Sequence, residues 1–352
     1  MQAIIKRVEP SVVLVVAYDG EGRVLGQAGG FFINREGDVI TNRRALTGAS
    51  RAGIKTSGGE FFSVKRVVAE DMEGDIIRIS TLPGNTVTPL NLSASLPADK
   101  EPVMVVGGSP GADRMVGESV ISAVREIPLF GNIIQISGEI FPGYSGSPVV
   151  NMKGEAVGVA LFQRVDEESL NFAVPSERIT RLLNGKGKTF AEWKSESGAG
   201  DPTSKEGLYF SGLIHLWAGD YEKAFPYFEK AARKSPGYAD ACFQKGYCNQ
   251  GLGRFKEAVG DYMDAIRINP GDENAYYYLG WTYAGLGRYG EAISSFKEAL
   301  RAKPRDARAH LSMGLVHLSH GDRDSASNEY MILKTIDGDM AKKLYDMIHK
   351  AD

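Results

Sequence analysis

The residue best placed for covalent chemistry is Ser145, which stands between glycines in the motif FPGYSGSPVVN. A glycine-flanked serine on a tight loop exposes a hydroxyl, but that hydroxyl is a poor nucleophile until a neighbouring base removes its proton. Histidine is the usual base. All five histidines follow residue 204, and they are His215, His310, His317, His320 and His349. The motif therefore predicts a nucleophile whose usual base is missing from its own part of the chain.

The part of the chain around Ser145 reads as many short strands. From Ser11 to about Val174, runs such as SVVLVVAY, GGFFIN, DIIRIS, PVMVVGG and NIIQIS are separated by glycine, proline and asparagine. This pattern is typical of a closed antiparallel barrel or a sandwich. The segment PSERITRLLNG then predicts a helix that closes a first domain, residues 1–184. The polar, non-periodic residues 185–204 predict a linker.

The remainder of the chain carries an internal repeat of 34 residues. Small residues, an aromatic residue and a closing proline recur in register, a pattern that resembles the tetratricopeptide (TPR) helix-turn-helix. In that motif the small residues let paired helices approach and the proline ends the second helix. We assign units 205–238, 239–272, 273–306 and 307–336 and a capping helix 337–350. The columns are Gly212, Gly246, Gly280 and Gly314; Gly219, Gly253, Gly287 and Gly321; Ala224, Ala258, Ala292 and Ala326; Phe228, Tyr262, Phe296 and Tyr330; and Pro236, Pro270 and Pro304.

The first domain resembles the high-temperature-requirement (HtrA) serine proteases over nearly its whole length. AGGFFINREGDVITN, EDMEGDIIRIS, NIIQISGEIFPGYSGSPVVNMKGEAVGVA and LNFAVPSERI carry the resemblance. It implies a multi-domain β plus α chain, in which a trypsin-like double β-barrel is followed by an α-solenoid of TPR helix pairs. It also implies that Ser145 is the nucleophile, Asp75 the triad aspartate and Gly143 a member of the oxyanion hole. The family's histidine position, two residues after TN, holds Arg44.

Arginine at position 44 cannot act as a base, because its guanidinium stays protonated and only donates hydrogen bonds. Our hypothesis is that Arg44 forms an ion pair with Asp75 and neutralises a carboxylate that lacks its imidazole. The alternative is that Arg44 is a tolerated surface residue. Glu139, six residues before Ser145, is either a wall of the specificity pocket or a carboxylate at its rim, and we assign no specificity from it.

The TPR resemblance implies a concave groove lined by the first helix of each unit, where family members hold extended peptides or partner helices. The positions lack the lysine and asparagine set of a carboxylate clamp, and an aromatic surface suits an apolar or proline-containing peptide. The alternative is that several of these rings pack between repeats or against the first domain. The predicted peptide-binding residues are Tyr209, Phe210, Phe243, Tyr247, Asn274, Tyr277, Tyr278 and Trp281, together with Leu213 and Gln244.

The bulk composition identifies no further partner. With 41 Lys+Arg and 44 Asp+Glu the net charge is -3, and no run of like charge predicts a nucleic-acid or membrane patch. No stretch is long and apolar enough to predict a membrane span, and the motifs predict neither a cofactor nor a metal site. Since the first predicted strand begins at Ser11, removal of an export signal stays open, and the resemblance implies the bacterial periplasm or another extracytoplasmic space. It also leaves an oligomer open.

Three functions fit these patterns. The first is a non-catalytic scaffold, a pseudoprotease joined to a TPR module that binds peptides or proteins. The second is an active HtrA-like serine endopeptidase whose TPRs recruit substrate proteins, which needs a base from outside the first domain. The third is a TPR adaptor whose barrel is only structural. The missing histidine favours the scaffold over the peptidase.

Overall fold

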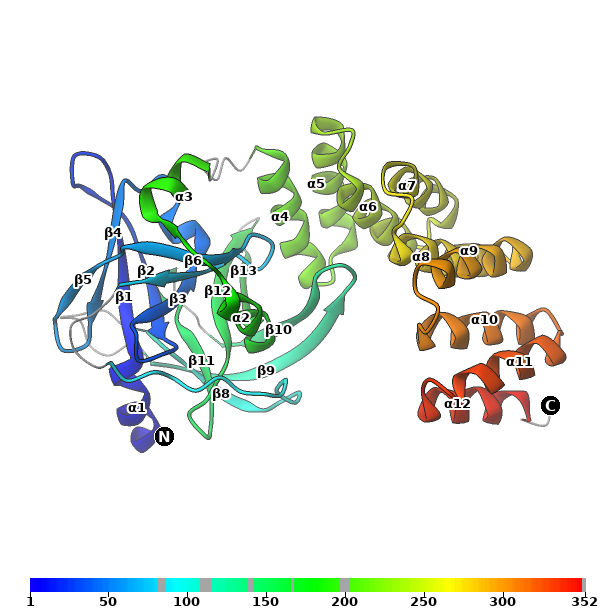
Figure 1. Cartoon of the computed structure of the whole chain (residues 1–352), viewed down its shortest axis with the longest axis horizontal. Coiled ribbons are helices and arrows are strands. Elements are labelled where there is room, and N and C mark those ends of the chain that lie inside the picture. Colours follow the sequence, from blue (N-terminus) through cyan, green and yellow to red (C-terminus); the bar gives the residue numbers. More distant parts are fainter. Residues whose placement is uncertain (82–86, 108–115, 139–141, 166–167, 197–202, 350–352) are drawn as a thin grey trace. The chain divides into compact units, whose positions relative to one another are not determined.

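The computed structural model of the chain describes residues 1–81, 87–107, 116–138, 142–165, 168–196 and 203–349 (Figure 1). The chain divides into two compact units, Met1–Asp201 and Pro202–Asp352. The first unit consists of β-strands with a few short helices, and the second of helices alone among the described residues. This change of architecture agrees with the sequence, in which hydrophobic residues in short alternating runs give way to a helical spacing.

The first unit begins with α1 (Gln2–Val8) and an antiparallel sheet of eight strands in the order β14-β6-β7-β3-β2-β1-β4-β5. Inward-facing valine, isoleucine and phenylalanine side chains of these strands form one buried cluster. The strands are β1 (Val12–Tyr18), β2 (Val24–Phe32), β3 (Asp38–Asn42), β4 (Arg51–Thr56), β5 (Phe61–Ser63), β6 (Arg66–Asp71), β7 (Ile76–Ser80) and β14 (Lys188–Thr189).

Six further strands close into a barrel in the order β10-β13-β12-β11-β8-β9. Closure pairs the backbone N–H and C=O groups that edge strands would otherwise expose. A second buried cluster, which includes Ile121, Val149 and Ala173, fills the interior. The strands are β8 (Pro102–Val106), β9 (Val116–Ile127), β10 (Gly131–Ser137), β11 (Pro148–Asn151), β12 (Ala156–Val165) and β13 (Glu168–Pro175). The helix α2 (Ser176–Arg181) follows directly.

The prediction that residues 185–204 are a linker is wrong for its first part. Residues Lys188–Thr189 form β14, which pairs antiparallel with β6, and Phe190–Glu196 form the helix α3. Phe190 and Trp193 are buried in the core of the eight-stranded sheet. The physical reason is that two aromatic side chains three residues apart share one face of a short helix, and burying them outweighs the polar character of their neighbours.

The second unit contains nine consecutive helices in its described residues, and each predicted repeat contains one pair of them. The second helix of each of the first three pairs ends two residues before a proline, as at Lys234 before Pro236. The helices are α4 (Lys205–Trp217), α5 (Tyr221–Lys234), α6 (Ala239–Gly251), α7 (Phe255–Ile268), α8 (Glu273–Gly285), α9 (Tyr289–Ala302), α10 (Ala307–Ser319), α11 (Arg323–Leu333) and α12 (Gly338–Ile348).

Two glycine columns of the repeat have separate structural causes. Gly287 turns the chain from α8 into α9 with a φ of 71°, a left-handed conformation that glycine adopts without strain. Gly280 lies against the ring of Phe296, where an added Cβ would stand 2.8 Å from a ring carbon. The glycine therefore lets the paired helices approach closely enough for the aromatic ring to fill the space between them.

Candidate active site and repeat groove

The Ser145 loop is held in place by backbone hydrogen bonds to two strands. A 3-10 turn, Pro142–Tyr144, leads into Ser145, whose carbonyl accepts a 2.8 Å hydrogen bond from the amide of Gly29 on β2. The amide of Gly146 donates to the carbonyl of Ala160 on β12 at 2.9 Å. Gly146 has a φ of 86°, and a Cβ there would lie 2.3 Å from the Gly29 carbonyl oxygen. Both the backbone conformation and the close approach therefore require glycine after the serine.

The Ser145 hydroxyl is bonded to the backbone of β12. The amide of Phe162 donates to Ser145 Oγ at 3.1 Å, and Oγ lies 3.5 Å from the Phe162 carbonyl oxygen. No base in the described part of the chain accepts its proton, and a lone pair of Oγ is already used by an amide donor. Such a hydroxyl is a weak nucleophile. Gly143 lies in the preceding 3-10 turn, and its part in an oxyanion hole stays a prediction.

Arg44 and Asp75 form the predicted ion pair, which is thereby confirmed. Arg44 Nε bonds to Asp75 Oδ2, and the backbone amide of Arg44 donates to Asp75 Oδ1 at 2.8 Å. The aspartate side chain is 7% exposed and the arginine side chain 36% exposed. Arg44 lies in the 3-10 turn Arg43–Leu46 that follows β3, and Asp75 directly precedes β7. The alternative of an unpaired surface arginine is wrong.

Burial raises the pKa of Asp75, because a carboxylate withdrawn from water loses solvation, and the neighbouring Arg44 opposes that rise. Arg44 keeps its proton under all ordinary conditions. The pair can therefore hold the turn and the carboxylate together, but neither partner can take the Ser145 proton as a catalytic histidine does.

Asn42 and Arg43, the two residues that precede Arg44, also bond to Asp75, and neither was predicted from the sequence as a site residue. The Asn42 side-chain amide donates to the Asp75 carbonyl at 3.2 Å, and the Arg43 amide donates to the same oxygen at 2.9 Å. Asp75 itself has a φ of 50°, a left-handed conformation that aspartate tolerates better than most residues. The run of polar residues TNRR, which ends the buried strand β3 and begins the turn after it, was the available signal. Glu139 lies outside the described residues.

The prediction of peptide-binding residues is corrected at Tyr209 and Phe243. Tyr209 is 3% exposed and its ring contacts Phe228 and Tyr238. Phe243 is fully buried against Tyr262 and Tyr278. Both rings pack within the repeats, so neither has surface to offer a peptide. Leu213 and Gln244 are buried as well.

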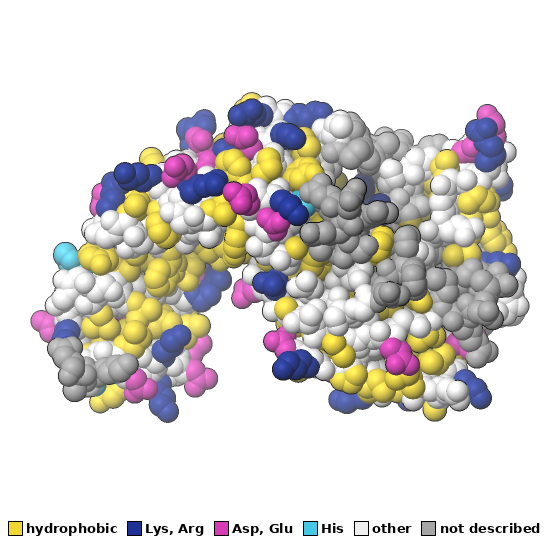
Figure 2. All heavy atoms as spheres, turned by 180° about the vertical axis from the view of Figure 1, so that it is seen from behind, with side chains coloured by type: hydrophobic (Ala, Val, Ile, Leu, Met, Phe, Trp, Pro, Cys, Tyr) yellow, Lys and Arg dark blue, Asp and Glu magenta, His cyan; other side chains and the backbone are white. Residues whose placement is uncertain are grey.

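The other predicted groove residues are half-buried. Tyr247 and Tyr278 meet edge-to-face with their ring centroids 5.5 Å apart, and Tyr277 meets Tyr278 in the same way at 5.3 Å. Trp281 and Tyr277 both contact the buried ring of Phe296. On the repeat unit, Figure 2 shows hydrophobic side chains along the inner side of the curve and many charged ones along its outer side. Half-buried residues that remain candidates are Phe210, Tyr247, Asn274, Tyr277, Tyr278 and Trp281.

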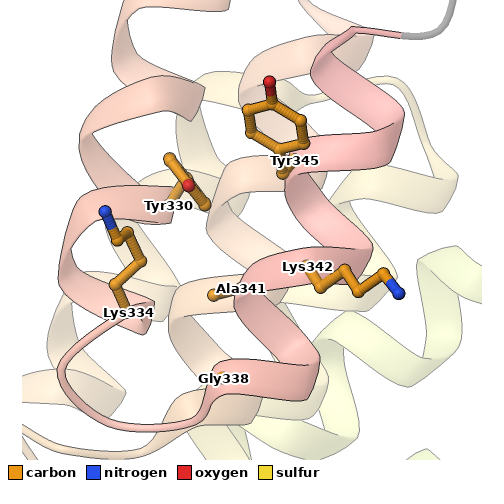
Figure 3. Close-up of a pocket in the computed structure, with 6 residues that line it drawn as sticks. All are labelled: Tyr330, Lys334, Gly338, Ala341, Lys342 and Tyr345. Atoms are coloured by element: carbon orange, nitrogen blue, oxygen red, sulfur yellow. The ribbon is translucent and has the colours of Figure 1, made fainter.

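A shallow pocket that the sequence did not predict lies between α11 and α12 (Figure 3). The rings of Tyr330 and Tyr345 stand 5.3 Å apart on one side, and Lys342 points away from them. The other lining residues are Lys334, Gly338 and Ala341. Both lysines are exposed, so the pocket is an open hollow on the surface of the capping helix.

Comparisons with known proteins agree with this architecture. A family model described as a trypsin-like peptidase domain matches residues 28–159, and two models described as tetratricopeptide repeats match residues 216–279 and 273–306. The chain carries a trypsin-like peptidase domain followed by tetratricopeptide repeats. The third predicted unit has the same bounds as the second of the two repeat matches.

Several relatives that match this domain are named as serine proteases. "Putative serine protease HhoA" of Synechocystis sp. is 29% identical over 174 residues, covering 47% of this chain and 44% of the relative. "Putative serine protease HhoB" of the same organism is 30% identical over 177 residues, covering 47% and 42%. "Serine protease HTRA2, mitochondrial" of Bos taurus is 26% identical over 211 residues, covering 56% and 45%. The chain thus spans less than half the length of these relatives.

A crystal structure of the serine endoprotease from Yersinia pestis aligns with a TM-score of 0.45 at 21% identity, over 51% of this chain and 64% of that one. Within the described residues, no group of three or more His, Cys, Asp or Glu side chains is arranged to hold a metal ion. No helix in the same residues is long and apolar enough to cross a membrane.

Proposed function

We propose that the chain is a non-catalytic scaffold, in which a peptidase-derived domain and a TPR module bind polypeptides. The observation that carries this proposal is the ion pair between Arg44 and Asp75 at the place where the family resemblance puts the histidine. The first unit contains no histidine in its sequence, so no other residue of that unit can replace it in the usual role.

The size of the expected loss follows from the chemistry of the triad. Ser145 keeps its hydroxyl and Asp75 keeps its carboxylate, but catalysis needs a group that takes the proton of Ser145 and later releases it to the leaving group. In a subtilisin-type triad, loss of the histidine costs roughly six orders of magnitude in turnover. Arg44 cannot recover any of it, because it stays protonated.

A peptidase assay tests this proposal. The full chain and its Ser145→Ala variant are incubated with labelled casein and with fluorogenic peptides, and both are expected to show the same background rate. Reaction with a fluorophosphonate probe gives a second readout of nucleophilicity. Turnover well above background that disappears in Ser145→Ala would overturn the proposal.

The second candidate is an active HtrA-like serine endopeptidase whose repeats recruit substrate proteins. The Ser145 loop and Asp75 favour it, because backbone hydrogen bonds still hold both of them in defined positions. It requires a base from the repeat unit or from another molecule. Activity that depends on protein concentration, or on a repeat histidine such as His320, would support it over the scaffold.

The proposed ligand of the repeat groove is an extended apolar or proline-containing peptide. Edge-to-face tyrosines with half-buried rings offer large contact area at low entropic cost. An array of immobilised peptides is probed with the full chain and with Trp281→Ala, which should lower the retained signal about tenfold. Tyr345→Ala removes an exposed ring of α12 and is the matched control, expected to bind as the unmodified chain does.

A further inference from the structure

The segment Lys188–Glu196, here called the strap, is attached to the edge of the eight-stranded sheet. Lys188 and Thr189 extend the sheet beyond β6, opposite Val67 and Arg66. The Arg66 guanidinium donates to the carbonyls of Lys186 and Gly187 at 2.9 and 3.2 Å. Backbone pairing with β6 and hydrogen bonds from the Arg66 side chain thus hold the strap, which follows the last strand of the closed barrel, to the edge of the sheet.

Two aromatic rings bind the strap to the interior. Phe190 is 7% exposed and Trp193 is 4% exposed, and their ring centroids lie 5.6 Å apart. Both belong to the same buried cluster as Val67 and Ile77. The strap therefore completes the core of the sheet and is not a tether lying on its surface.

The strap also reaches the turn that carries Arg44. The Trp193 indole Nε1 donates to Glu70 Oε2 at 3.0 Å, and Arg43 Nε bonds to the same oxygen at 2.6 Å. The Arg43 guanidinium lies over the Trp193 ring at 5.8 Å. Because the Arg43 amide donates to the Asp75 carbonyl, one continuous set of contacts runs from Trp193 through Glu70 and Arg43 to Asp75.

We propose that the strap is a latch on the Arg43–Leu46 turn: while Trp193 is docked on Glu70, the turn is held in the conformation that pairs Arg44 with Asp75. Undocking the strap would leave Arg43 as the partner of Glu70 without the Trp193 indole and ring beside them, and would thereby loosen the turn and the pair. The strap thereby controls the conformation of the Ser145 domain at its substituted triad position. This inference goes beyond the proposed function and does not depend on whether the site is catalytic.

Hydrogen-exchange mass spectrometry on the full chain tests the latch. Trp193→Phe keeps an aromatic ring in the core, although a smaller one, and removes the indole N–H that bonds to Glu70. Loss of a hydrogen bond to a charged group should speed amide exchange in residues 43–49 about tenfold, while peptides from β11, β12 and the repeats stay unchanged. Glu70→Gln, which removes the charge that holds Arg43, should give the same pattern.

Phe190→Leu is the matched control, because Phe190 lies in the same core but donates no hydrogen bond to Glu70. It should speed exchange in residues 188–196 and leave residues 43–49 within about twofold of the unmodified chain. Faster exchange confined to the strap in Trp193→Phe would overturn the coupling. So would faster exchange spread evenly over the first unit, or equal loosening of the turn in Phe190→Leu, because each would make Trp193 an ordinary core residue.

Discussion

Each unit of the molecule buries a carboxylate against a basic side chain, and the two basic side chains differ in kind. In the peptidase domain, Asp75 is paired with the fixed charge of Arg44. In the fourth repeat, Glu329 is paired with His310, whose Nδ1 lies 2.7 Å from a Glu329 oxygen. The other ring nitrogen of His310 lies 3.1 Å from the Pro304 carbonyl oxygen.

An imidazole paired with a carboxylate, as in a catalytic triad, is therefore present in the chain. It lies in the repeat unit, however, and the Ser145 nucleophile lies in the peptidase domain. The Pro304 carbonyl only accepts hydrogen bonds, so His310 Nε2 carries a proton and is not available as a base. Bonds to Glu329 and to Pro304 both raise the pKa of His310, with the Glu329 bond the larger cause. The repeat unit therefore contains a pair whose basic partner can lose its proton, whereas the basic partner of Asp75 in the unit with the nucleophile stays protonated.

The largest effect is expected from Arg44→Ala, which leaves the buried Asp75 carboxylate without its partner. Breaking a buried pair costs about 3–5 kcal/mol, and the partial exposure of Arg44 reduces this to about 2–3 kcal/mol of unfolding free energy. Urea unfolding can be followed by fluorine NMR of fluorotryptophan, because Trp193 is the single tryptophan among residues 1–201.

The loss in Arg44→Ala should be smaller near pH 4 than at pH 7. Burial raises the pKa of Asp75, and a carboxyl with a raised pKa destabilises the fold only after it ionises. Arg44→Lys, which keeps the positive charge, should lose about 1 kcal/mol or less. If alanine and lysine at position 44 unfold at the same urea concentration, the ion pair does not stabilise the domain.

A smaller effect is expected from His310→Ala, which removes a donor from both Glu329 and the Pro304 carbonyl. Hydrogen bonds to charged groups contribute about 1.5–3 kcal/mol, and we expect a loss of about 2 kcal/mol in the unfolding of the repeat unit. Circular dichroism at a helix wavelength measures it, since nearly all long helices lie in that unit. His317→Ala is the control on the same helix, and an equal loss there would show that the Glu329 pair is not special.

The smallest effect is the pH dependence of the fourth repeat. The folded pKa of His310 is raised above the ordinary value of 6.5, so its contribution is fully present below pH 6.5 and is lost as pH rises through the folded pKa. The urea midpoint of the repeat unit should therefore fall over that range, and it should fall less in His310→Ala. A His310 proton resonance that titrates below its ordinary value would contradict the pairing.

The chemistry-bearing residues could be predicted from the sequence because each lies in a short local motif. Ser145 stands in a glycine-flanked turn, whereas Arg44 and Asp75 were placed side by side by the resemblance to the HtrA proteases, and their opposite charges then predicted the ion pair. The hydrogen bond that the Phe162 amide donates to Ser145 Oγ could not be predicted, because it depends on how the loop lies against β12.

Which aromatic rings of the repeats are buried could not be predicted from the sequence, for a different reason. Tyr209 and Tyr277 occupy equivalent positions in their repeats, yet Tyr209 is buried and Tyr277 is half-buried. Exposure depends on which side chains the adjacent helices supply, and a 34-residue period does not contain that information. The strap was missed because its polar residues suggested a linker, although the spacing of Phe190 and Trp193 was a usable signal.

The most direct test of the central claim is to restore the base. Arg44→His places an imidazole beside Asp75, on a turn whose amide already bonds to that carboxylate. If the missing base alone silences the site, this variant should hydrolyse casein or fluorogenic peptides at least about a hundredfold faster than the same variant with Ser145→Ala. An inactive Arg44→His variant, or an unmodified chain with equal Ser145-dependent turnover, would contradict the account.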